Sequence, residues 1–295
     1  MLFRSICHDN ALNEELFAIP EEERFMAFAK FLHYIIMELK SRDLADVIAF
    51  AEIFNEADGL FFVTKYRPAQ YSDEETAVFK KRHAEAIAWL QKTHPDMLFA
   101  YDSYSVTADL RLVPENIDVF NFHSYYLWSI YDKVKELSPD SFEQVATPNN
   151  VIAAFTNHRN GIEEPGWYNR LSLFAGLKPD KISELEVRLE ESLKQDYARY
   201  RDKAFSFADT VMKLREINPD IRVVSGEGTT YISSKELLWE EHSEIFWELV
   251  EEVVKKYRDA GLWGTVVRTC MGPEDPAWHL IPEKILKINR IFLEE

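Results

Sequence analysis

Val47-Ile48-Ala49-Phe50-Ala51-Glu52-Ile53-Phe54-Asn55-Glu56 is a run of mostly apolar residues that ends in an Asn-Glu pair. An almost continuous apolar run of this length is typical of a strand buried on both faces of a parallel sheet. A second run, Ile221-Arg222-Val223-Val224-Ser225-Gly226-Glu227, also ends in a glutamate. Two carboxyl groups held across one pocket can divide the acid, base and nucleophile roles of a reaction. Glu56 and Glu227 are therefore the first candidates for a site.

Short apolar runs alternate with longer amphipathic segments along the chain. The pattern predicts strands over 2–7, 47–54, 97–101, 117–122, 221–224 and 264–268, and helices over 21–42, 73–93, 182–217, 235–260 and 282–293. Alternation of this kind predicts parallel βα units, whose strands end at one face of the sheet. We expect an α/β fold of the (β/α)8 TIM-barrel type. Only six strands are visible, which leaves an open, irregular or N-terminally truncated barrel as the expectation.

The chain is long enough to bury a large core. Its 295 residues, 46% of them hydrophobic, predict a single domain over 1–295. The segment 129–180 contains prolines and glycines together with aromatic residues such as Trp167 and Phe174. We interpret this segment as an excursion that walls one side of a pocket, because a linker would not carry so many aromatic side chains.

Charge, cysteine content and hydropathy argue against several classes of protein. A formal net charge of -17 disfavours binding to a nucleic-acid backbone or to an anionic membrane surface. Two cysteines, Cys7 and Cys270, form neither a disulfide framework nor a zinc cluster. No stretch approaches the roughly 18 apolar residues of a membrane span, and no secretory leader pattern is present. We therefore expect a cytoplasmic protein.

The segment Glu52-Ile53-Phe54-Asn55-Glu56 resembles the fourth-strand signature of a large clan of retaining glycoside hydrolases. This clan is built on (β/α)8 barrels and includes cellulases, mannanases and β-galactosidases. The resemblance implies that Glu56 is the general acid/base and that Asn55 hydrogen-bonds the sugar 2-hydroxyl group. Ser225-Gly226-Glu227-Gly228 is similar to the seventh-strand segment that carries the nucleophile, which would be Glu227.

Further segments extend the resemblance. Phe122-His123-Ser124-Tyr125 is similar to the sixth-strand His-x-Tyr of the clan, whose tyrosine contacts the nucleophile; Tyr126 takes this place if the register shifts by one residue. On this correspondence the excursion at 129–180 follows the sixth strand, and 2–7 and 264–268 are strands three and eight. The other implied substrate-binding residues are His8, Asp9 and Asn10 after strand three, and Tyr231 and Trp278 on loops after later strands.

The resemblance implies an oligo- or polysaccharide substrate and requires no metal or organic cofactor. Two departures leave alternatives open: Ala57 stands where the clan has proline, and its strand-two arginine has no counterpart here. One alternative is a sugar-converting barrel enzyme whose divalent metal is bound by Glu56, His123, Glu227 and Asp9. Another is a degenerate barrel that binds carbohydrate without cleaving it. The oligomeric state stays open.

Overall fold

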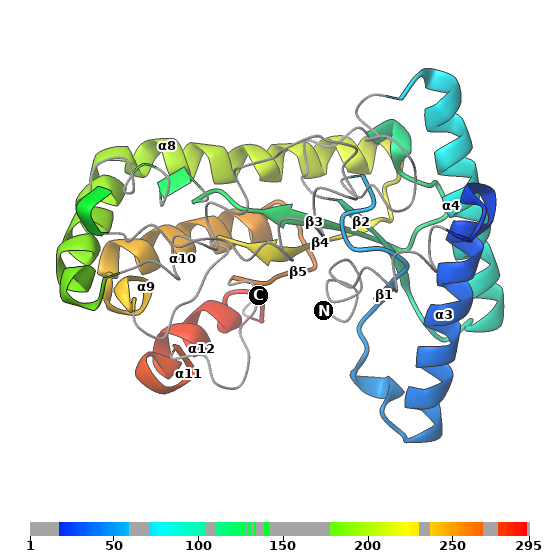
Figure 1. The fold of residues 1–295 in the computed structure, drawn as a ribbon, viewed down its shortest axis with the longest axis horizontal. Helices are drawn as coiled ribbons and strands as arrows, with labels where there is room; N and C mark the ends of the chain where they lie inside the picture. Colours follow the sequence, from blue (N-terminus) through cyan, green and yellow to red (C-terminus); the bar gives the residue numbers. More distant parts are fainter. Residues whose placement is uncertain are drawn as a thin grey trace. The chain divides into compact units, whose positions relative to one another are not determined.

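The computed structural model of the protein has a mixed α/β fold around a parallel sheet of five strands (Figure 1). The strands are hydrogen-bonded in the order of the chain: β1 Ala51–Glu52, β2 Phe99–Ser103, β3 Val119–Ser124, β4 Arg222–Gly228 and β5 Gly264–Thr265. The residues that the structure describes are 18–58, 71–103, 110–127, 129–130, 133, 139–141, 178–229, 237–267 and 277–293. The α/β class predicted from the sequence is confirmed.

Helices lie between most of these strands along the chain, whereas the described residues between β2 and β3 form only a 3-10 turn. The helices are α3 Glu21–Ser41, α4 Asp73–Thr93, α8 Ile182–Ile217, α9 Trp239–His242, α10 Glu244–Asp259, α11 Ala277–Leu280 and α12 Pro282–Arg290. Single 3-10 turns are η1 Ala45–Val47, η3 Leu110–Leu112, η4 Pro139–Ser141 and η5 Pro179–Lys181. No helix within the described residues is long and apolar enough to cross a membrane.

The chain divides into two compact units. The first consists of Met1–Phe122, Asn150–Ile162 and Lys213–Val224, and the second of His123–Asn149, Glu163–Met212 and Ser225–Glu295. Strands β3 and β4 and helix α8 each contribute residues to both units. A single domain over 1–295 stays a prediction.

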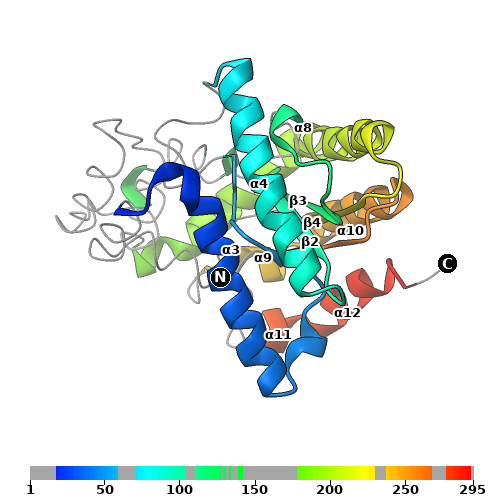
Figure 2. The same cartoon turned by 90° about the vertical axis from the view of Figure 1, so that its right-hand side faces the viewer.

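In the first unit, α3 and α4 lie side by side (Figures 1 and 2). The ring centroid of Phe25 on α3 lies 5.1 Å from that of Phe79 on α4 and 5.2 Å from that of Phe54, which follows β1. Helix α4 begins with a capping box, in which the Ser72 hydroxyl accepts the N–H of Glu75 and the Glu75 carboxylate accepts the N–H of Ser72. The helix predicted over 73–93 is confirmed, because a strong cap and an apolar face agree there.

In the second unit, α8 and α10 lie side by side (Figure 1). The Tyr197 hydroxyl donates to the Glu252 carboxylate at 3.1 Å. The single helix predicted over 235–260 is wrong, because the chain forms α9 and α10 with a break at Ser243. The Ser243 hydroxyl caps α10 by accepting the N–H of Phe246 and also donates to Glu190 on α8. Ser243 thus caps a free backbone N–H at the start of α10. Hydrophobic periodicity does not reveal a cap of this kind.

The strand predicted over 47–54 is shorter than expected. Only Ala51 and Glu52 pair with β2, opposite Phe99 and Ala100, and Val47 lies in η1 with its side chain 81% exposed. By contrast, β2, β3 and β4 each extend toward their carboxyl ends beyond the apolar runs that predicted them. Polar residues occupy these extensions, so hydropathy alone placed the strand ends too early. The predicted strand at 2–7 lies outside the described residues, as does most of the excursion at 129–180.

His83 is a titratable residue inside the core of the first unit. It is 1% exposed, neither of its ring nitrogens has a hydrogen-bond partner among the described residues, and its ring lies 5.1 Å from Phe25 and 5.4 Å from Tyr101. Burial lowers the pKa of His83 from 6.5 to about 3, because the imidazolium ion would lose its hydration there. The folded protein therefore keeps this imidazole neutral well into the acidic range.

We expect the stability of the protein to fall in acid partly through His83. The unfolded chain takes up a proton near pH 6.5 and the folded chain only near pH 3, so this contribution is complete above pH 6.5 and is lost as the pH falls toward 3. Its slope is about 1.4 kcal/mol per pH unit. Urea unfolding of His83→Leu between pH 7 and 4 should show a shallower dependence than the wild type. The exposed His242→Leu serves as the control, and equal slopes in both variants would contradict the assignment.

Candidate active site

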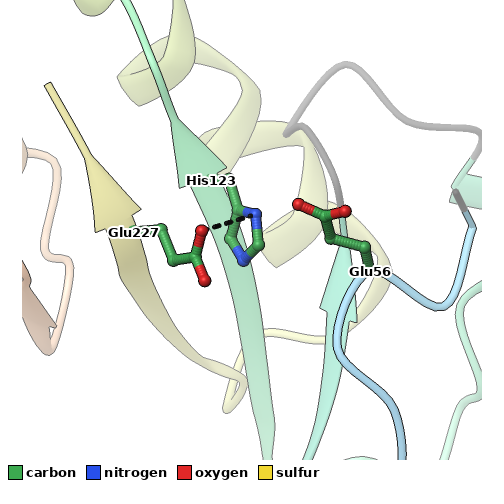
Figure 3. Close-up of side chains that lie close together, drawn as sticks. All are labelled: Glu56, His123 and Glu227. Atoms are coloured by element: carbon green, nitrogen blue, oxygen red, sulfur yellow. Dashed lines mark ion pairs between the residues drawn. The ribbon is translucent and has the colours of Figure 1, made fainter. Parts of the chain in front are cut away.

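Glu227 lies near the end of β4 and is contacted by His123, which lies near the end of β3, and by Tyr125, which follows β3. The hydroxyl of Tyr125 donates a hydrogen bond to its carboxylate, and Nδ1 of His123 lies 3.5 Å from the same carboxylate oxygen (dashed line in Figure 3). The side chain of His123 is fully buried, whereas that of Glu227 is 18% exposed. A carboxylate that is oriented by a hydroxyl donor and still reaches solvent can contact a ligand.

Tyr125 and Tyr126 make different contacts. The hydroxyl of Tyr125 contacts Glu227, whereas that of Tyr126 accepts a hydrogen bond from Thr229 at 3.0 Å. The backbone carbonyl of Tyr125 also accepts a hydrogen bond from Lys203 on α8 at 3.2 Å. The residue implied by the His-x-Tyr resemblance is therefore the one next to Glu227.

Buried hydroxyl groups and close backbone contacts fix the end of β4. The hydroxyls of Ser124 and Ser225 are hydrogen-bonded at 2.7 Å, and Ser225 Oγ also donates to the carbonyl of Glu227 at 3.4 Å. On the other side of β4, the N–H of Val266 donates to the carbonyl of Ser225 at 2.7 Å. A Cβ atom on Gly228 would lie 2.8 Å from the Val266 carbonyl oxygen and 2.9 Å from Ser124 Oγ. Glycine is thus required beside Glu227, because no side chain fits.

Glu56 belongs to the first unit and lies on the turn after β1; it is also labelled in Figure 3. Its φ is 55°, a left-handed conformation that is uncommon for a residue with a side chain. Its N–H donates to the carboxylate of Asp102 at 2.6 Å, and the N–H of Ala57 donates to the carbonyl of Asp102 at 3.0 Å. Proline has no N–H, so this turn uses a hydrogen bond that the clan's usual residue at position 57 could not make.

Three polar residues of the sheet near Glu56 are not evident as site residues from the sequence pattern. In the register of β2 and β3, Asp102 lies opposite Asn121, two positions beyond the apolar pair Ala100 and Val119. Asp102 is fully buried and Asn121 is 5% exposed. The amide of Asn121 donates to the carboxylate of Glu52 on β1 at 3.2 Å. The sequence feature that could have identified such a residue is a polar side chain within an otherwise apolar strand, such as Asn121 between Phe120 and Phe122.

The remaining predicted site residues are placed as follows. Asn55 precedes Glu56 on the same turn and is partly exposed. Trp278 lies on α11 rather than on a loop, with 43% of its surface exposed. His8, Asp9, Asn10 and Tyr231 lie outside the described residues. The structure therefore brings His123, Tyr125 and Glu227 together in the second unit, and Asn55 and Glu56 on one turn of the first.

The side chains of these residues are of the types that serve in general acid–base and nucleophilic catalysis. In the second unit, Glu227 is an accessible carboxylate with a hydroxyl donor and the imidazole of His123 beside it. In the first unit, Glu56 offers a separate carboxylate. Oxygen and imidazole groups of this kind are also ligands for divalent metals such as manganese. The residue types are thus compatible with both enzyme classes considered from the sequence.

Comparisons with known proteins give a fold and no family. No family model matches the chain, and no curated protein matches its sequence. A crystal structure of a "putative glycoside hydrolase" from Parabacteroides distasonis is similar, with a TM-score of 0.56 and 14% identity. The match covers 94% of this chain and 65% of the other, so this chain spans just under two thirds of that protein's length. The chain therefore has a glycoside hydrolase-like fold.

We expect Gly228→Ala to destabilise the protein. The new methyl group would meet the Val266 carbonyl and Ser124 Oγ at less than contact distance, and overpacking of this kind costs about 1–3 kcal/mol. Gly264→Ala is the matched control, because a Cβ atom there would meet no atom beyond the adjacent residues within 4 Å. Urea unfolding should show a lower midpoint for Gly228→Ala only. Equal midpoints in the two variants would mean that β4 and β5 are not closely packed at Gly228.

Proposed function

We propose that the protein is a retaining glycoside hydrolase, in which Glu227 is the nucleophile and Glu56 the general acid/base. The contact between the Tyr125 hydroxyl and the Glu227 carboxylate is the observation that carries the proposal, since a hydroxyl donor orients the carboxylate. The glycoside hydrolase-like fold supports the same reaction class. The substrate would be an oligo- or polysaccharide.

The proposed reaction has two steps. Glu227 attacks the anomeric carbon while Glu56 donates a proton to the leaving oxygen, so that the glycosidic bond breaks and a covalent glycosyl-enzyme forms. Glu56 then removes a proton from water, which attacks the same carbon and releases Glu227. Asn55 would hydrogen-bond the sugar 2-hydroxyl group. The mechanism requires the two carboxyl groups to be about 5–5.5 Å apart around the sugar.

The strand order supports the barrel part of the proposal. Glu56 follows β1, whereas Asp102, His123 and Glu227 each lie one residue before the end of β2, β3 and β4. In a parallel (β/α)8 barrel, active-site residues come from the carboxyl ends of several strands. We propose that the five strands belong to a (β/α)8 barrel. On the proposed correspondence, β1 to β5 are strands four to eight of that barrel.

Glu227→Ala should abolish cleavage of any glycoside that the wild type hydrolyses, with a loss of roughly a thousandfold or more in kcat. Azide is small enough to occupy the place of the lost carboxylate, and it should restore turnover by forming a glycosyl azide of inverted configuration. Product analysis by NMR measures both effects. Glu283→Ala on the exposed side of α12 is the control. Unchanged turnover in Glu227→Ala would rule out this nucleophile.

Glu56→Ala should separate substrates by their leaving group. A dinitrophenolate departs without protonation, so its glycoside should keep much of its rate of glycosylation, whereas an unactivated glycoside should lose about 100-fold or more. Pre-steady-state kinetics of both substrates measure the difference, and an equal loss on both would contradict the general-acid role. A parallel assay with chelator tests the metal alternative, which predicts loss of activity on chelation and recovery with manganese or magnesium.

A further inference from the structure

Thr229 occupies an unusual position two residues after Glu227. Its φ is 61°, which is a strained conformation for a β-branched residue. It is 2% exposed, and its hydroxyl donates to the hydroxyl of Tyr126 at 3.0 Å. Strain of this kind persists where surrounding contacts enforce it, and such contacts are present on both sides of Thr229.

The backbone of Thr229 is bound to the segment that carries Tyr125. The N–H of Thr229 donates to the carbonyl of Ser124 at 3.3 Å, and its carbonyl accepts the N–H of Leu127 at 3.1 Å. Together with the bond to Tyr126, these contacts reach the residues immediately before and after Tyr125. The turn that follows Glu227 is thereby fastened to the turn that presents its hydroxyl donor.

Tyr125 and Tyr126 divide two tasks between adjacent side chains. Tyr125 donates to Glu227, and Tyr126, which is 2% exposed, receives the bond from Thr229. We infer that Thr229 and Tyr126 are positioning residues that hold the Glu227 carboxylate against the Tyr125 hydroxyl. Their effect on catalysis rests on the proposed function, whereas their effect on the contact between Tyr125 and Glu227 does not.

The Tyr126 phenol is suited to a structural bond. Burial raises its pKa, so the group stays neutral and its hydroxyl remains available as a hydrogen-bonding partner. Removal of either hydroxyl leaves the other buried without this bond, which makes substitution costly. Loss of the bond is expected to let the two turns separate slightly, and a misplacement of about 1 Å near a reacting group can lower the rate by up to about 100-fold.

Tyrosine labelled with ¹³C at Cζ gives a direct reading of the contact. The chain has 13 tyrosines, and the resonance of Tyr125 is assigned by its absence in Tyr125→Phe. We expect that resonance to move in Thr229→Val and in Tyr126→Phe, and to move no further in the double variant, because both substitutions remove one and the same bond. Thr229→Ser keeps the hydroxyl and should leave the resonance in place, as should Thr210→Val on α8.

Kinetics with a cleaved glycoside give the second readout. Thr229→Val and Tyr126→Phe should lower kcat about tenfold with KM within about twofold, and Thr229→Ser should stay near the wild type. An unmoved Tyr125 resonance in both variants would overturn the inference. If Thr229→Val fails to fold, the Tyr125 resonance in Tyr126→Phe and in Thr229→Ser tests the inference. A wild type that cleaves no glycoside refutes the proposed function alone, because the resonance still reports whether the two residues hold the contact.

Discussion

The parallel pairing of β2 with β3 is the constraint on which the rest of the described structure depends. Its register places Ala100 beside Val119 and, two residues further on, Asp102 beside Asn121. The first pair packs in an apolar cluster, and the second pair is buried but polar. Since both pairs lie on one face, this part of the sheet changes from apolar to polar toward the carboxyl ends of β2 and β3.

Neutral hydrogen-bonding groups are prominent around Glu227. Tyr125 contacts its carboxylate, and the hydroxyl pair of Ser124 and Ser225 and the bond from Thr229 to Tyr126 fix the backbone on either side. Hydroxyl groups orient an anion without adding charge, so they stabilise it at a smaller desolvation cost than a buried ion pair would carry. The Glu227 carboxylate is thus held by a hydroxyl donor and still reaches solvent.

Backbone strain accompanies both candidate carboxylates. Glu56 itself has a φ of 55°, and Thr229, near Glu227, has a φ of 61°. Conformations of this kind cost of order 1–3 kcal/mol and cluster at functional sites. In each case hydrogen bonds to a neighbouring strand or turn enforce the conformation, from Asp102 at Glu56 and from Ser124 and Leu127 at Thr229. Each candidate carboxylate therefore lies at or near a backbone position of positive φ that hydrogen bonds enforce.

The sequence by itself determined the α/β class, the helices over 73–93 and 182–217, and the presence of Glu56 and Glu227 at or just after the ends of two strands. It also pointed to Tyr125 and to a glycoside hydrolase-like fold. These features follow from local periodicity and short motifs. The tertiary structure alone decided the short β1, the break at Ser243 and the burial of polar residues within strands.

The physical reason lies in the distance along the chain between interacting groups. The N–H of Glu56 donates to a carboxylate 46 residues away along the chain, and the amide of Asn121 donates to a carboxylate 69 residues away. The hydroxyl of Thr229 donates to the hydroxyl of a tyrosine 103 residues away. A polar side chain can be buried only where such a partner satisfies it. Periodicity reports which apolar side chains leave water, and the partners of polar ones become visible only once the chain has folded.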